Sequence, residues 1–171
     1  SQMLLIGLDG QLVAAHPPGA GMQSAGLADL IAGARERGSA TGFQSVGQTL
    51  YQLVVVPVMA PVPVAWVAVG FAVDEAFALD LKGLTGLDVS LLRQPADGAA
   101  QLVVSTLPRA PQAALLAGAD VGSMQIDGVE HVGLRHVVEA QADEQVVAVL
   151  QLSLARARAP WARLYRDWAG R

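Results

Sequence analysis

The segment 53–73 (LVVVPVMAPVPVAWVAVGFAV) carries no charged residue and constrains the fold more than any other part of the chain. Its length suits a membrane-spanning helix, which needs about 20 apolar residues. Pro57, Pro61 and Pro63 argue against a helix, because each proline removes a backbone donor and crowds the preceding turn. The valine-rich runs on either side favour extended backbone. We therefore predict a β-hairpin, with strands over 50–58 and 64–73 and a turn at 60–63.

Both faces of these two strands are apolar, which is typical of central strands in a sheet covered on both sides. The chain has 171 residues, of which 53% are hydrophobic, enough for one domain or two small modules. A net charge of −4 argues against nucleic acid as a partner. The absence of cysteine excludes disulfides and thiolate metal sites.

Turn and capping signals divide the rest of the chain. The Asp9-Gly10 and Asp127-Gly128 pairs predict two β-hairpins, since these dipeptides suit a type I′ turn. Asp74 is a good N-cap residue. We predict helices over 27–37, 75–84, 111–117 and 155–168. We predict strands over 3–8, 11–15, 41–46, 50–58, 64–73, 87–92, 101–107, 124–126, 129–140 and 146–154.

One order of elements is used twice: two strands, a helix and three strands. Strands grouped around a short helix indicate an α+β fold, here two tandem modules, each an antiparallel sheet with flanking helices. We expect a first, membrane-distal module at 1–74, a linking helix at 75–86, a second, membrane-proximal module at 87–155 and a C-terminal helix at 156–171. Neither end has the features of a natural terminus, and we expect the chain to be a piece of a longer protein.

Several segments together resemble a bacterial receptor family. They are 51–58 (YQLVVVPV), 66–71 (WVAVGF), 79–92 (LDLKGLTGLDVSLL) and 147–154 (VAVLQLSL), the last followed by an arginine-rich helix. The chain resembles the double-Cache, PAS-like sensory region that lies between two transmembrane helices of signalling proteins.

The resemblance implies a periplasmic, ligand-sensing part of an inner-membrane receptor, itself without catalytic activity. Its output would be a cytoplasmic diguanylate cyclase (GGDEF) or phosphodiesterase (EAL) domain, hence cyclic-di-GMP signalling, or alternatively a histidine kinase. None of these output motifs occurs in the chain. No amino-acid-binding signature of the best-known Cache receptors is present either, so the resemblance leaves the small-molecule ligand open.

A ligand cleft is expected in the first module, around the apolar hairpin, where loops can cover a sheet. The predicted lining consists of aromatic and methionine side chains with two possible polar anchors: Tyr51, Trp66, Phe43, Met59 and Phe71, with Gln52 or His16. The alternative is that all of these are ordinary core residues.

The C-terminal segment places Trp161, Tyr165 and Trp168 on one stripe of a helix. Such a helix suits the membrane interface, or it packs on the domain itself or on the equivalent helix of a homodimer. His131 and His136 do not predict a metal site, because they point to opposite faces of a strand. We predict no metal, no cofactor and no catalytic residue, since no serine has a glycine elbow or a suitably spaced histidine.

Three classes of function therefore compete. A sensor module would respond to a small ligand, whereas an interaction module would dimerise receptors or bind a periplasmic protein without one. The high apolar content favours some such contact, because an uncharged surface is usually covered. The third class, a soluble enzyme, lacks any supporting constellation.

Overall fold

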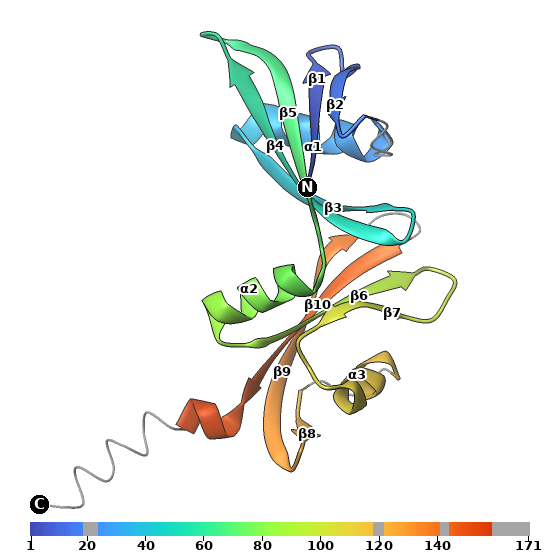
Figure 1. Ribbon diagram of the computed structural model, residues 1–171, viewed down its shortest axis with the longest axis vertical. Coiled ribbons are helices and arrows are strands. Elements are labelled where there is room, and N and C mark those ends of the chain that lie inside the picture. The colour runs from blue at the N-terminus through green and yellow to red at the C-terminus, as the bar shows by residue number, and fades with distance from the viewer. Residues whose placement is uncertain (19–23, 118–121, 141–143, 159–171) are drawn as a thin grey trace, which may run out of the picture. The chain divides into compact units, whose positions relative to one another are not determined.

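A computed structural model describes residues 1–18, 24–117, 122–140 and 144–158. The chain divides into two compact units, Ser1–Val73 and Asp74–Arg171. Each unit contains one five-stranded antiparallel sheet, so the α+β prediction is confirmed (Figure 1).

The first unit contains five strands and one helix among its described residues. They are β1 (Gln2–Gly7), β2 (Leu12–His16), α1 (Ser24–Arg37), β3 (Ala40–Val46), β4 (Thr49–Met59) and β5 (Pro63–Ala72). The strands lie in the order β2-β1-β5-β4-β3, so β5 and β4 are central. The uncharged segment is therefore an extended hairpin, as predicted, and its turn is closed by a hydrogen bond from Ala60 N to Val62 O of 2.8 Å.

The second unit repeats this arrangement. Its elements are α2 (Glu75–Thr85), β6 (Asp88–Pro95), β7 (Gln101–Ser105), α3 (Arg109–Leu116), β8 (Met124–Ile126), β9 (Val129–Ala140) and β10 (Glu144–Ser153). The strand order, β7-β6-β10-β9-β8, is the order of the first sheet with each strand number raised by five. The helix interpreted from the sequence as a linker, α2, lies within this unit and packs against β6 and β7.

Helices cover the two sheets differently. In the first unit α1 packs on one face, against β3 and β4, and its Leu27 and Ile31 lie in the core. In the second unit Figure 1 shows α2 and α3 on opposite faces of the sheet. Asp74 caps α2, accepting a hydrogen bond from Phe77 N at 3.0 Å as its sequence position predicted.

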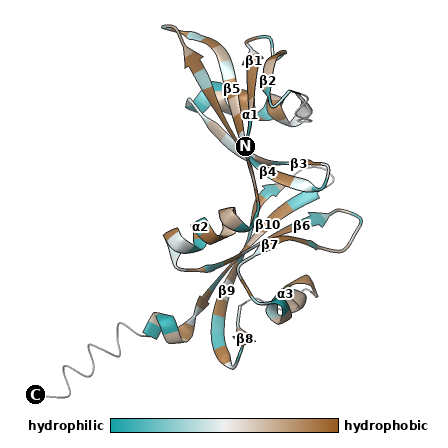
Figure 2. Ribbon diagram, in the orientation of Figure 1, coloured by the Kyte–Doolittle hydropathy of each residue, from teal (hydrophilic) through white to brown (hydrophobic). Residues whose placement is uncertain are grey.

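In the part of the first unit that the structure describes, a helix covers only one face of the sheet, which differs from the predicted cover on both faces. Met3 is 49% exposed and Phe71 is 44% exposed, and both lie on the face away from α1. No helix among the described residues of the first unit packs on this face. Figure 2 shows the hydrophobic colouring that runs along β4 and β5. Apolar residues on both faces of a strand show that it is central, but they do not show what covers it.

The two Asp-Gly turns differ. In the turn between β8 and β9 both Asp127 (φ 49°) and Gly128 (φ 74°) are left-handed, as a type I′ turn requires. In the turn between β1 and β2 only Gly10 has a positive φ, so the type I′ prediction is wrong there although the hairpin itself is present. The Asp9 carboxylate accepts a hydrogen bond from Gln11 N at 3.0 Å, which stabilises a longer turn.

Candidate functional site

The covered face of the first sheet, the one beneath α1, is built mainly from aliphatic side chains. Alternation along the strands places Leu4 and Ile6 of β1, Leu53 and Val55 of β4, and Ala68 of β5 on it. All five are at most 2% exposed. Burying a side chain of this size contributes about 1.5–3 kcal/mol, so these residues account for the stability of the unit rather than for recognition.

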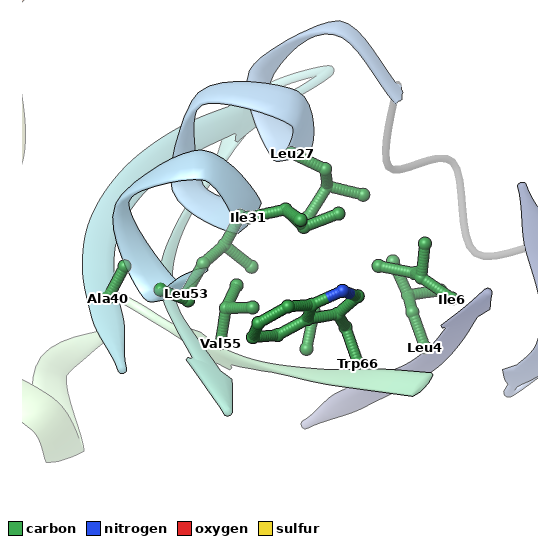
Figure 3. Close-up of a cluster of buried hydrophobic side chains, with 10 residues drawn as sticks. Leu4, Ile6, Leu27, Ile31, Ala40, Leu53, Val55 and Trp66 are labelled. Atoms are coloured by element: carbon green, nitrogen blue, oxygen red, sulfur yellow. The ribbon is translucent and has the colours of Figure 1, made fainter. Parts of the chain in front are cut away.

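Trp66 is the polar exception at one end of this face. It lies opposite Ile6 on β1 and Pro57 on β4, and it is 3% exposed. Its indole Nε1 is buried and has no hydrogen-bond partner among the described residues. Figure 3 shows this nitrogen directed toward the space between Ile31 of α1 and Ile6 of β1. An unpartnered buried donor costs about 1–3 kcal/mol, a cost that a bound acceptor would remove.

Arg35 brings a positive charge to the same end. Its guanidinium carbon lies 6.0 Å from the centroid of the Trp66 ring, within the range of a cation–π contact. Its Nη2 donates to the Leu8 carbonyl oxygen at 2.8 Å, which holds the arginine near the end of β1. Arg35 and the Trp66 indole are both donors, so this end of the face favours an acceptor such as a carboxylate.

A second polar group lies at the opposite end of the covered face. Gln2 Nε2 donates to the Tyr51 hydroxyl at 3.3 Å, while Gln2 Oε1 is buried without a partner among the described residues. Gln44 lies on β3, the strand next to that of Tyr51. Its amide nitrogen is 3.1 Å from the position that a Cβ on Gly26 of α1 would occupy. Gly26 therefore allows the start of α1 to approach this polar end closely.

The residues predicted to line a ligand cleft do not share one face. Tyr51 and Trp66 lie on the covered face. Phe43, Gln52 and Phe71 are aligned across β3, β4 and β5 on the other face. Met59 is 57% exposed at the end of β4. His16, opposite Met3, is exposed at the end of β2. A single pocket on one side of the sheet can include at most part of the predicted set.

Sequence reasoning missed Arg35, Gln2 and Gln44. Arg35 falls within the predicted helix 27–37 but was not connected with a site. Every second residue of a strand points to the same face of the sheet. On the face that holds Gln2 in β1 and Gln44 in β3, the other residues are apolar or glycine, and a glutamine in such a pattern is the signal that could have found them.

The two histidines of β9 point in opposite directions, as predicted. His131 is 8% exposed, whereas His136 is exposed. Among the described residues no group of three or more His, Cys, Asp or Glu side chains could hold a metal ion. The predicted aromatic stripe of Trp161, Tyr165 and Trp168 lies outside the described residues. No helix in the described part of the chain has both the length and the apolar character that crossing a membrane requires.

Comparison with known families gives a match along most of the chain. The model of a family described as the double sensory domain of two-component sensor kinases (dCache_3) matches residues 1–153. No curated protein sequence matches the chain significantly.

Solved structures with a similar fold include ligand-binding domains of two chemoreceptors. The domain of Pseudomonas fluorescens CtaA in complex with L-isoleucine is 13% identical, with 92% of this chain and 71% of that chain covered and a TM-score of 0.47. The domain of Pseudomonas aeruginosa PAO1 PctB in complex with L-Arg is 12% identical, with 92% and 73% covered and a TM-score of 0.42. An extracellular ligand-binding receptor from Desulfohalobium retbaense is 10% identical, with 87% of this chain and 29% of that chain covered and a TM-score of 0.42.

Proposed function

Because the chain belongs to the family of double sensory domains of two-component sensor kinases, we propose that it is the extracytoplasmic, ligand-binding part of a bacterial membrane receptor. The family assignment confirms the predicted resemblance to double-Cache regions. The two sheets with one shared strand order are the two modules of this domain. In the proposed receptor, transmembrane helices flank the chain and its location is periplasmic.

We propose the Trp66 end of the covered face of the first sheet as the ligand site, and Trp66 carries the proposal. A buried indole N–H without a partner, beside an arginine, is a donor site that lacks its acceptor. The ligand would be a small molecule with a carboxylate, which can accept from Nε1 and attract the guanidinium. Tyr51 lies on the same face but at its opposite end, with its hydroxyl bonded to Gln2, so it is not part of the proposed carboxylate site.

Ligand binding acts on a receptor by shifting the equilibrium between its conformations. A carboxylate that binds one arrangement of α1 and the sheet more tightly than another shifts the equilibrium by that difference in affinity. The output would be a histidine kinase, because the family is described from two-component sensor kinases. A cyclic-di-GMP enzyme, the first choice of the sequence analysis, is the alternative output.

The first experiment is a thermal-shift screen with short carboxylic acids, each paired with its amide, followed by calorimetry on any acid that raises the midpoint. Trp66→Phe keeps the ring and removes the donor, and we expect it to weaken binding of that acid at least tenfold. Phe71→Leu, an aromatic change on the opposite face, is the matched control and should keep the affinity. Equal affinity of Trp66→Phe and the native protein would contradict the proposed site.

A second candidate function, a dimerising interaction module, is favoured by the open face of the first sheet. This face carries apolar side chains from three adjacent strands, among them Met3, Val56 and Phe71, and all three are more than a third exposed. Sedimentation of the protein and of a Met3→Ser, Phe71→Ser double variant tests it. A homodimer lost in the variant supports the interaction module, whereas a native monomer at all accessible concentrations contradicts it.

A further inference from the structure

A band of polar side chains crosses the covered face of the second sheet, beneath α3. Register places Ser105 opposite Ser90 across β7 and β6, and His131 opposite Met124 across β9 and β8. Gln151 on β10 lies between these two pairs, since its neighbour on the same face, Val149, pairs with Ser90. We call these five residues the polar band. Ser90 is 0%, Gln151 1% and His131 8% exposed, so the band lies inside the unit.

Gln151 is the least satisfied member of the band. Its Nε2 donates to the Met124 sulfur at 3.4 Å, and a thioether is a weak acceptor. Its Oε1 is buried and has no donor within the part of the chain that the structure describes. A buried carbonyl oxygen without a donor is unfavourable, and a leucine of similar size would avoid the cost. The amide oxygen is therefore a position at which a bound donor would be stabilised.

The serine and histidine side chains of the polar band supply a further donor and a further acceptor. Ser90 and Ser105 share one hydrogen bond of 2.6 Å between their hydroxyls, and Ser105 Oγ also accepts from Leu107 N at 3.0 Å. One of the two hydroxyl protons is used in this pair, which leaves the other as a donor. His131 Nδ1 is 3.0 Å from the Val129 carbonyl oxygen, which assigns the proton to Nδ1 and makes Nε2 an acceptor.

None of the five residues of the polar band is an Asp, Glu, Lys or Arg. The carboxylate of Asp88, which lies opposite Gln151, is paired with Lys82 Nζ at 2.6 Å. Its Oδ1 also accepts from the Thr106 hydroxyl at 2.9 Å. Asp88 is thus already compensated. A cation on the same face, Arg135 of β9, pairs in register with Val149, but it is exposed and its guanidinium donates to Gln94 Oε1 at 2.8 Å, away from Gln151. Neutral donors and acceptors are the chemistry that fits.

We propose that the polar band is a second binding site, for a small neutral molecule with two or more hydroxyl groups. One ligand hydroxyl donates to Gln151 Oε1, and a second ligand hydroxyl accepts the free serine proton. His131 Nε2, which lies four residues further along β10 than Ser90 and on the opposite side of that strand, is an acceptor for a longer ligand. The site is formed by residues of the second unit and does not depend on Trp66. It therefore differs in place and in ligand chemistry from the carboxylate site proposed in the first unit.

The test is an NMR titration of the isotope-labelled chain with glycerol and erythritol. The signals to follow are the Gln151 side-chain amide and the Ser90 backbone amide. We expect both to shift saturably with the polyols and not with 1,2-dimethoxyethane, which has similar size and oxygens but no donor. Trp66→Phe should give the same titration, which separates this site from the one in the first unit.

Two variants and one control complete the test. Gln151→Leu and Ser105→Ala should each weaken the saturable response at least tenfold, while Gln145→Leu, an exposed position on the same strand, should leave it within twofold. Absence of a saturable shift in the native protein, or an unchanged shift in Gln151→Leu, overturns the proposal. A crystal structure in glycerol that shows only an ordered water at Gln151 Oε1 overturns it as well.

Discussion

The two units share one strand order and differ in what lies on the covered face of each sheet. In the first unit that face is aliphatic except at its ends, where Trp66 presents a donor without a partner. In the second unit a band of polar residues crosses the face, and Gln151 presents an acceptor without a partner. The two covered faces thus leave different groups without partners: the Trp66 donor and the Gln2 acceptor in the first unit, and the Gln151 acceptor in the second. Ligand chemistry in such a domain depends on a few inward positions rather than on topology.

The units also differ in how their sheets are covered. The second sheet has a helix on each face, whereas the open face of the first sheet is uncovered by any helix in the described part of its unit (Figure 1). The inner faces should therefore control the stability of each unit, and polar contacts outside them should matter less.

The largest expected effect comes from the core. Leu53→Ala in the first unit and Leu92→Ala in the second remove side chains that are 0% exposed, and each should lower the free energy of unfolding by about 2–5 kcal/mol. Chemical denaturation followed by hydrogen exchange should assign each loss to its own unit. An equal loss of protection in both units from either variant would show that they unfold as one.

An intermediate effect is expected at Asp88, which anchors α2 to the second sheet. Asp88→Ala removes the acceptor of both Lys82 and Thr106 and should cost about 1–3 kcal/mol. Asp97→Ala, an exposed carboxylate in the turn after β6, is the control and should change stability by less than about 0.5 kcal/mol. Equal stability of the two variants would show that the anchor contributes nothing.

The smallest effect is expected at the glycines that follow the C-terminal ends of two helices. Gly38 after α1 (φ 84°) and Gly86 after α2 (φ 71°) each close a helix, with hydrogen bonds of 2.8 Å to Ala34 O and Lys82 O. A Cβ at either position meets no atom within 4 Å, so alanine there should cost about 1 kcal/mol through backbone strain alone. Gly83→Ala, inside α2 and equally open, should instead stabilise by about 0.5–1 kcal/mol. Thermal midpoints of the three variants measure the difference, and a destabilised Gly83→Ala would contradict it.

Much of the fold could be predicted from the sequence, because its signals are local. Prolines and Asp-Gly pairs mark turns, and runs of valine mark the strands between them. The repeat of strand and helix order then gives two modules.

The sites could be predicted only in part. Tyr51 and Trp66 lie on the covered face, whereas their predicted companions Phe43, Gln52 and Phe71 lie on the other face. When both faces of a strand are apolar, alternation no longer indicates which one is inside. Gln151 sits in the apolar run VAVLQLSL and gave no signal of its own, because its lack of a donor depends on how the neighbouring strands pack.

The most direct test of the sensory account is the NMR signal of the Trp66 indole proton. The chain has three tryptophans, and Trp66→Phe identifies the signal by removing it. If a carboxylate that raises the thermal midpoint binds at this nitrogen, its addition should move the indole signal downfield and the movement should saturate. An indole signal that stays in place while such a ligand saturates the protein would contradict the proposed site.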